Sequence, residues 1–335
     1  MRAREVYLSQ VPEGTATADD FAVRDVDVPE PRQGQVLVGV RRLGLNAGLA
    51  SRLGAEGTSY GPGIGVGDVP ASDAVVEVLR SGSDAWQQGE LAVRTSPWRT
   101  ADVCDPRELR RLPDVDVPLE THLTILGHVG FTAWTGMVHV GEVRPTDTVY
   151  VSAAAGGVGS CAVQYAKAFG ARVIGLAGSP EKVALLTDDL GADAAINRHD
   201  GDALDLLRGA APDGIDLYYD NVGGEQLAAA LKVLNQHGRV VLCGAVAATQ
   251  DGPPDLRPMI YQELTMRGFT VTAHEDLRGR FEEQVGGWLR EGRVTSVHTV
   301  FDGIDRVPAA FASLLSGGSR GRVVVAVERQ TETSP

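Results

Sequence analysis

Lysine is scarce in this 335-residue chain, because only Lys167, Lys182 and Lys232 stand among its 31 basic residues. Acidic residues number 44, which leaves a formal net charge of −13, and the sequence contains no cluster of basic residues. A surface of this sign repels nucleic acid and anionic membranes, so we expect neither as a partner. Any phosphate group that the protein binds must therefore be held by a few local cations.

Cysteine is scarce as well. Cys104, Cys161 and Cys243 are odd in number and far apart, which argues against a disulfide framework and against a CxxC metal site. A catalytic zinc ion needs three clustered Cys, His or carboxylate ligands, and the closest pair of histidines, His122 and His128, has no partner cysteine nearby. The sequence therefore predicts no metal site.

Long apolar runs are missing too. No stretch approaches the 18 apolar residues of a membrane-spanning helix, and the N-terminal MRAREVYLSQV lacks the apolar core of a signal peptide. We expect a cytoplasmic protein.

The chain is long enough for two hydrophobic cores, and its first part is β-rich in pattern. Short strands separated by turns are expected there, followed by an irregular segment from Pro97 to Pro118. The expected strands cover 5–8, 21–28, 35–44, 73–78 and 90–94.

From Asp147 onward strand and helix patterns alternate, which predicts a parallel sheet covered by helices on both faces, an α/β fold. We expect the C-terminal strand to complete the β-rich domain. That domain would comprise 1–124 and 298–335, with a doubly wound domain at 125–297 inserted between its parts. The expected strands of the second part are 148–151, 173–177, 194–197, 217–220, 240–243 and 264–272, with a helix at 276–293 and later elements at 296–301, 308–315 and 322–328.

A glycine turn lies between the strand expected at 148–151 and the helix that follows it. Ala153, Gly156 and Gly159 are spaced by three, so backbone amides can approach a pyrophosphate without interference from Cβ atoms. A flexible glycine loop is the plainer alternative, but it does not explain the strand before the turn, the helix after it and a second strand at βαβ spacing. We interpret the turn as a dinucleotide site. Its candidate cofactor-binding residues are Ala155, Gly156, Gly157, Val158 and Gly159.

The end of the next strand indicates which dinucleotide is bound. An NAD site normally has an acidic residue about 20 positions after the glycine turn to hold the ribose diol, and none stands at Leu176 to Ser179. Instead Gly178 and Ser179 are followed by Lys182, and Arg198 stands after the third strand. Two cations can hold the 2′-phosphate of NADPH. The alternative is that Lys182 is a solvated lysine of the helix that Ser179 caps.

Several segments together resemble a known family, the zinc-independent medium-chain dehydrogenases/reductases of the leukotriene/prostaglandin reductase and curcumin reductase group. The resemblance covers nearly the whole chain. It implies a GroES-like substrate-binding and catalytic β domain, a Rossmann domain that binds NADPH, and a homodimer. The matching segments are LGHVGFTAWTG (126–136), AAAGGVGS (153–160), GSPEKV (178–183), PDGIDLYYDNVGG (212–224), GRVVLCGA (238–245), MIYQEL (259–264), VPAAF (307–311) and GRVVV (321–325).

The resemblance also implies further cofactor-binding residues at strand ends. In relatives, the lysine and the residue at the Arg198 position bind the 2′-phosphate. Cys243 could be mistaken for a nucleophile, but it follows an apolar strand without an obvious base, so a packing role is favoured. The additional residues implied to line the cofactor channel are Asn221, Cys243, Gly244, Ala245, Phe269 and Val271, with Ser319 where relatives commonly carry an Asn.

The substrate side departs from the family pattern. Where relatives carry Asp-Pro-Tyr-Met-Arg this chain has GLASR at 48–52, so a tyrosine is replaced by Ala50. Tyr60, in Ser-Tyr-Gly-Pro, and Tyr261 remain as candidate catalytic hydroxyls that could stabilise an enolate or relay a proton. Each has an alternative: Tyr60 as a surface loop residue, Tyr261 as a structural one.

These features predict an NADPH-dependent reductase of an α,β-unsaturated carbonyl double bond in a hydrophobic small molecule, with hydride transfer to the β-carbon. Three alternatives stay open. One is a reductive cyclase that tailors a polyketide-like intermediate, for example a polycyclic tetramate macrolactam. The others are a quinone reductase and an NADPH-binding protein without turnover.

Overall fold

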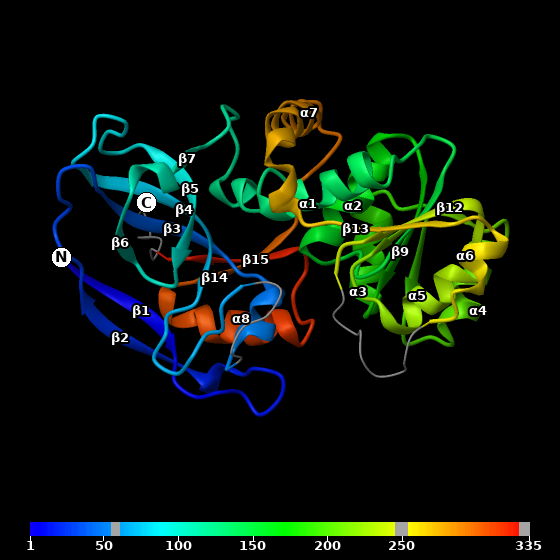
Figure 1. The fold of residues 1–335 in the computed structure, drawn as a ribbon, viewed down its shortest axis with the longest axis horizontal. Helices are drawn as coiled ribbons and strands as arrows, with labels where there is room; N and C mark the ends of the chain where they lie inside the picture. The colour runs from blue at the N-terminus through cyan, green and yellow to red at the C-terminus, as the bar shows by residue number, and fades with distance from the viewer. Residues whose placement is uncertain (55–60, 245–253, 328–335) are drawn as a thin grey trace, which may run out of the picture. The chain divides into compact units, whose positions relative to one another are not determined.

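The computed structural model describes residues 1–54, 61–244 and 254–327, and the chain divides into two compact units (Figure 1). The first unit comprises residues 1–124 and the chain from His298 onward, and the second comprises residues 125–297. Each unit is organised around its own sheet.

The first unit contains a seven-stranded mixed sheet and a separate two-stranded antiparallel sheet. The C-terminal strand lies inside the larger sheet, because β15 pairs parallel with β14 on one side and antiparallel with β3 on the other. The smaller sheet consists of β1 (Arg2–Leu8) and β2 (Phe21–Asp27). The larger runs in the order β14 (His298–Asp302), β15 (Arg322–Ala326), β3 (Val36–Gly44), β4 (Ala71–Ser81), β5 (Leu91–Pro97) and β7 (Arg110–Arg111), with β6 (Ala101–Cys104) paired to β3.

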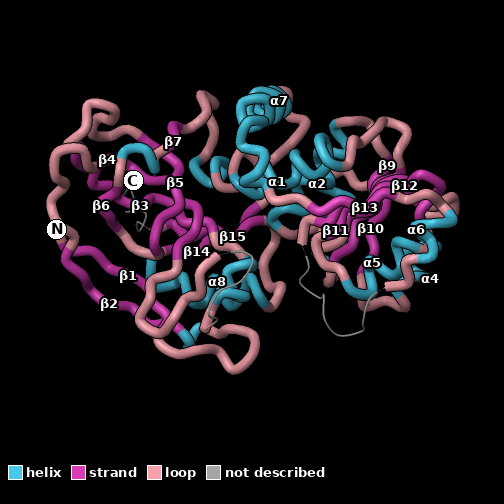
Figure 2. Tube along the Cα trace, in the orientation of Figure 1, coloured by secondary structure: helices cyan, strands magenta, loops and turns pink. Residues whose placement is uncertain are grey.

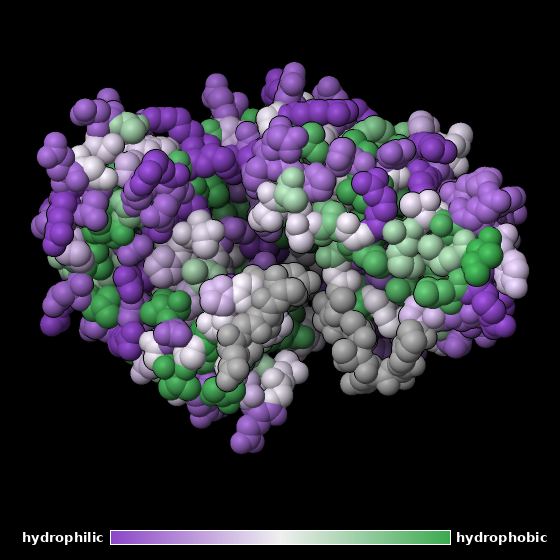
Figure 3. Space-filling model, in the orientation of Figure 1, coloured by the Kyte–Doolittle hydropathy of each residue, from purple (hydrophilic) through white to green (hydrophobic). Residues whose placement is uncertain are grey.

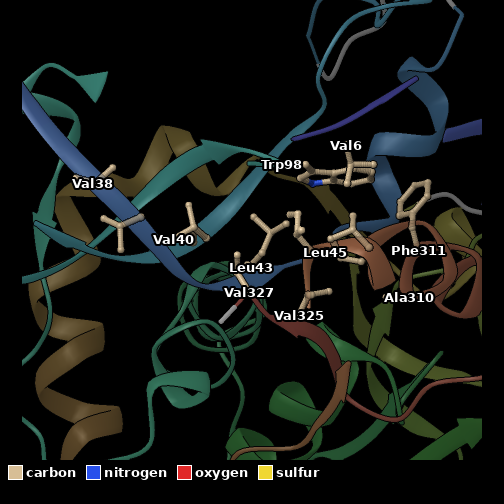
Figure 4. Packing of buried hydrophobic residues seen from close by; sticks show 14 of the residues in the cluster. Val6, Val38, Val40, Leu43, Leu45, Trp98, Ala310, Phe311, Val325 and Val327 are labelled. Carbon is tan, nitrogen blue, oxygen red and sulfur yellow. The ribbon is translucent and has the colours of Figure 1, made fainter. Parts of the chain in front are cut away.

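The core of the first unit joins strands from both ends of the chain. Figure 4 shows Leu43 and Leu45, on and after β3, beside Val325 of β15. Trp98 packs edge-on against Phe311 of α8 (Val307–Leu315), with ring centroids 5.4 Å apart. Burial of these apolar side chains stabilises the sheet.

The second unit holds a six-stranded parallel sheet (Figure 2). Its strand order is β10-β9-β8-β11-β12-β13, so the order reverses between β8 and β11, the place where open α/β sheets bind ligands. The strands are β8 (Thr148–Val151), β9 (Arg172–Ala177), β10 (Ala194–Asn197), β11 (Ile215–Asp220), β12 (Leu234–Leu242) and β13 (Thr265–Gly268). The helices are α1 (His128–Trp134), α2 (Gly157–Ala168), α3 (Pro180–Ala184), α4 (Ala203–Ala210), α5 (Gly224–Leu231), α6 (Arg257–Tyr261) and α7 (Arg278–Arg290).

Burial on both faces explains why these strands stay between two helical layers. Tyr150, Ile174, Tyr218 and Val240 point to one face of the sheet, where they pack with Leu231 of α5. Their neighbours along each strand are also buried, on the face that α2 covers. Strands buried on both faces are the mark of a doubly wound parallel sheet, and this confirms the predicted fold class.

Two sequence predictions were wrong in detail. The segment from Pro97 to Pro118 is not irregular throughout, because β6 pairs with β3 and β7 pairs with β5. The strand expected at 264–272 ends at Gly268, and a 3₁₀ helix, Val271–Leu277, follows. Phe269 lies beside Gly136 and is not part of the strand. Strand propensity does not predict such a contact between distant segments.

The surface drawn in Figure 3 is mostly hydrophilic, with hydrophobic residues in smaller groups. No helix among the described residues is long and apolar enough to cross a membrane.

Candidate cofactor-binding site

The glycine turn connects β8 to α2, and Gly156 is the N-cap of that helix. A Cβ atom on Gly159 would lie 2.2 Å from the carbonyl oxygen of Ala153, so no side chain fits at this position. Ala153 itself adopts a left-handed conformation with φ +47°. The first N–H groups of a helix have no acceptor within the helix, so this turn presents donors and partial positive charge to an anion.

A second group of residues lies where β9 and β10 end side by side. The two strands are parallel, with Asn197 opposite Ala177, and the Arg198 N–H donates to the Ala177 carbonyl at 2.9 Å. The Arg198 side chain lies over Gly178, because a Cβ atom placed on that glycine would be 3.2 Å from Arg198 Nε. The strand register therefore brings Arg198 to the start of α3.

Charge accumulates in this second group. Burial and the nearby Arg198 guanidinium lower the pKa of the Lys182 ammonium, which places two cations within interaction distance. Arg198 Nε also donates to His199 Nε2 at 3.2 Å. Ser179 caps α3 through its side-chain oxygen, which accepts from the Lys182 N–H. An anion bound here would relieve the repulsion between the two cations.

A third group follows β11 and β12. The side-chain Nδ2 of Asn221 donates to the Ser152 carbonyl at 2.7 Å. On the other side, a Cβ atom on Gly244 would lie 2.7 Å from the Asn221 carbonyl oxygen, so the two turns touch through their backbones. Burial raises the pKa of the Cys243 thiol to about 11, so this side chain is a neutral thiol at pH 7 rather than a nucleophile. Ala245 lies outside the described residues.

Phe269 and Val271 follow β13. Val271 is buried, and the Phe269 ring reaches the region of Gly136 together with Tyr219: a Cβ atom on Gly136 would meet both rings within 3 Å. Gly136 belongs to a π-helical turn, Thr135–Val140, a distortion that is frequent at functional sites. These contacts hold the segment after β13 against the π-helical turn that follows α1.

Three predicted site residues remain. Tyr60 lies outside the described residues, and Ser319 is a buried residue of the first unit. Tyr261 is the last residue of α6, 78% exposed, and it precedes β13 at the edge where the parallel strands begin. The glycine turn and the cations lie at the opposite edge, so the structural alternative for Tyr261 is favoured and we assign it no catalytic role.

Sequence reasoning missed two residues of the third group, Ser152 and Asp220. Both are buried polar side chains at the carboxyl ends of the neighbouring strands β8 and β11. A polar residue that ends an apolar strand just before a candidate site is the signal that could have found them. Among the described residues, no group of three or more His, Cys, Asp and Glu side chains could hold a metal ion.

Two family models match the chain. One, described as the N-terminal domain of oxidoreductase, matches residues 4–112, and the other, described as zinc-binding dehydrogenase, matches residues 157–285. The NADPH-dependent curcumin reductase of Escherichia coli is 32% identical over 336 residues, covering 97% of each chain. Prostaglandin reductase 1 of Rattus norvegicus is 34% identical over 323 residues, covering 93% of this chain and 95% of the relative.

A solved structure agrees with these relatives. The crystal structure of CurA from Vibrio vulnificus in complex with NADPH superposes with a TM-score of 0.90 at 30% identity, covering 97% of this chain and 99% of that one. The fold and the dinucleotide geometry define a medium-chain dehydrogenase/reductase. The chain belongs to the zinc-independent group of that family, with the curcumin and prostaglandin reductases.

Proposed function

We propose that this protein is an NADPH-dependent reductase of a carbon–carbon double bond conjugated to a carbonyl group in a hydrophobic small molecule. Relatives named as curcumin, prostaglandin and 2-alkenal reductases span nearly the whole chain at 32–34% identity. In this proposal the second unit binds the cofactor, the first unit shapes the substrate site, and the chain forms a homodimer.

The observation that carries the cofactor assignment is the pair of cations at the ends of β9 and β10. The Arg198 guanidinium lies over Gly178, and it lowers the pKa of Lys182, which burial lowers as well. A bidentate guanidinium beside an ammonium suits a phosphate, whereas the diol of NADH calls for a carboxylate. The glycine turn would hold the pyrophosphate of the same cofactor on the first N–H groups of α2.

When bound, NADPH would supply a hydride for the β-carbon of the substrate. The chain's own residues must then hold the cofactor and stabilise the negative charge on the carbonyl oxygen. Asn221 would offer its Oδ1 to a cofactor donor, because its Nδ2 is engaged by the Ser152 carbonyl, which can only accept. Tyr60 is the proposed hydroxyl for the enolate or for proton relay to the α-carbon.

Turnover of defined substrates tests this function. The purified chain is incubated with NADPH or NADH and a panel of enones, enals and quinones. Cofactor oxidation is followed, and the masses of the products are measured by mass spectrometry. We expect NADPH oxidation with enones or enals and products that carry two additional hydrogen atoms. Tight NADPH binding without turnover across the panel contradicts the proposal, and a product with a new carbon–carbon bond identifies a reductive cyclase instead.

The Tyr60→Phe variant tests the hydroxyl in this reaction, because it removes the oxygen and keeps the ring. We expect kcat to fall by about 10²-fold, the usual range for one acid/base group, with unchanged NADPH affinity. Tyr261→Phe is the matched control and should leave turnover unchanged. Normal turnover of Tyr60→Phe would assign the proton to water or to a ribose hydroxyl.

A further inference from the structure

Asp220 is the last residue of β11, and its carboxylate is completely buried. One oxygen, Oδ1, accepts four hydrogen bonds: from the Tyr218 hydroxyl at 2.8 Å, the Ser152 hydroxyl at 3.3 Å, the Val222 N–H at 2.9 Å and the Gly223 N–H at 2.8 Å. The other oxygen, Oδ2, is buried and has no hydrogen-bond partner among the described residues. A buried carboxylate left half-satisfied is costly, so its position calls for a reason.

The four donors fix the turn that carries Asn221. The Val222 and Gly223 N–H groups fix the turn by donating to Asp220 Oδ1. Gly223 has φ +77° and ψ −151°, a conformation that almost only glycine adopts. Ser152 links Asp220 to Asn221, because its hydroxyl donates to Asp220 Oδ1 and accepts from the Asn221 N–H at 2.9 Å. Backbone contact with Gly244 closes the other side.

A second aspartate on the same strand provides an internal comparison. Asp216, near the start of β11, also clamps backbone to side chain: it accepts from the Thr148 N–H at 2.8 Å and from Asn235 Nδ2 at 2.9 Å. Asp216 is half-buried and uses both oxygens for structure. Asp220 concentrates its bonds on one oxygen, and all of them converge on the place where the strand order reverses.

We propose that Asp220 is a positioning residue for the cofactor. Through Ser152 and the two amides it holds the Asn221–Gly223 turn in its binding conformation before NADPH arrives, so that no binding free energy is used to order the turn. This inference rests on the proposed binding of NADPH. It assigns Asp220 no contact with the cofactor and no part in the chemical step.

Binding to the full-length chain tests the proposal. Dissociation constants for NADPH and NADH are measured for the wild type and for Asp220→Asn, with Asp216→Asn as the matched control, well below each melting temperature. In Asp220→Asn an amide replaces one oxygen, so the four donors cannot all be satisfied without leaving an N–H buried and unpaired. We expect both dissociation constants to rise by about 10-fold, the equivalent of roughly one hydrogen bond to a charged group, with their ratio unchanged.

The control separates positioning from general loss of stability. Asp216→Asn should lower the melting temperature and leave both dissociation constants within about twofold of wild type, and kcat of Asp220→Asn at saturating NADPH should change far less than its KM for NADPH. Wild-type affinity in Asp220→Asn, or an equal loss in Asp216→Asn, overturns the proposal. If Asp220→Asn does not fold, the Ser152→Ala variant is tested in its place. Its dissociation constants for both dinucleotides should rise by about threefold, and unchanged dissociation constants would contradict the proposal. A wild type that binds neither dinucleotide instead overturns the proposed function itself.

Discussion

In the six-stranded sheet, the amino ends of the parallel strands form one edge, the amino edge, and their carboxyl ends form the other, the carboxyl edge. The two edges differ in how their charges are arranged. Where the strands begin, charges are paired: Arg239 Nη2 lies 2.6 Å from Asp147 Oδ1, with side chains 14% and 5% exposed, and Arg239 Nη1 donates to the Gly141 and Glu142 carbonyls at 2.8 Å. Where the strands end, like charges gather at Lys182 and Arg198. We propose that the first edge stabilises the fold and that the second binds a ligand.

Charge, and not backbone strain, distinguishes the two edges. The carboxyl edge holds the left-handed Ala153 and the buried Asp220 Oδ2, which has no hydrogen-bond partner among the described residues, but the amino edge holds the left-handed Glu142, His237 and Glu263. Substitutions of the charged residues at the two edges should therefore separate binding from stability.

The largest effect is expected at the carboxyl edge. In Lys182→Ala/Arg198→Ala two charge-assisted contacts to the 2′-phosphate are lost, each worth roughly 1.5–3 kcal/mol. NADPH affinity should fall by about 10²-fold or more, NADH affinity should hardly change, and the melting temperature should stay near that of the wild type. Isothermal titration with both dinucleotides measures this. Equal affinity of the wild type for NADPH and NADH would contradict the proposal that these two cations bind the 2′-phosphate.

A comparable but purely structural effect is expected at the amino edge. Arg239→Met leaves the buried Asp147 carboxylate without its cation, so the free energy of unfolding should fall by roughly 3 kcal/mol. Urea denaturation measures the loss, and NADPH titration should show wild-type affinity. Arg257→Met is the control, because Arg257 pairs with Asp255 on the exposed surface and its removal should change neither quantity measurably. Weakened NADPH binding in Arg239→Met would show that the edges are coupled.

The smallest effect is expected at Asp193, which precedes β10 at the amino edge. Burial raises its pKa, but hydrogen bonds from Lys167 and the Val173 N–H outweigh burial and lower the pKa overall. The folded state therefore binds the proton more weakly than the unfolded state, whose pKa is about 3.9. Stability from this group is present above that value and is lost as the pH falls through the lower folded-state pKa.

The Asp193→Asn variant removes this dependence. Between pH 5 and pH 3, its free energy of unfolding should change less than that of the wild type. The difference should be on the order of 1 kcal/mol or below, because the Asp193 carboxylate is partly exposed and therefore screened by solvent. Chemical denaturation at stepped pH measures the difference. A steeper decline in Asp193→Asn than in the wild type would contradict the sign of the shift.

The sequence was sufficient for the fold class and for the strands at 148–151 and 194–197, because local patterns determine them. It also grouped Lys182 with Arg198, and the structure brings these two cations near each other because β9 and β10 are parallel neighbours. Local patterns do not encode contacts between distant residues. Ser152 and Asp220 are 68 positions apart, and Phe269, which was expected to continue β13, lies beside the distant Gly136 instead.

The position of β15 inside the first sheet has a consequence for synthesis on the ribosome. One edge of β3 pairs with β15 through Gly44, Leu43 and Arg42, and Arg322 of β15 also donates to the Gly44 carbonyl and to Asp73. These partners emerge only after residues 125–297 have been made, about ten to thirty seconds later at typical translation rates. The second unit is continuous in sequence and can fold during that interval. The first unit must wait with part of its sheet unpaired, so residues made after the second unit complete a sheet that was begun before it.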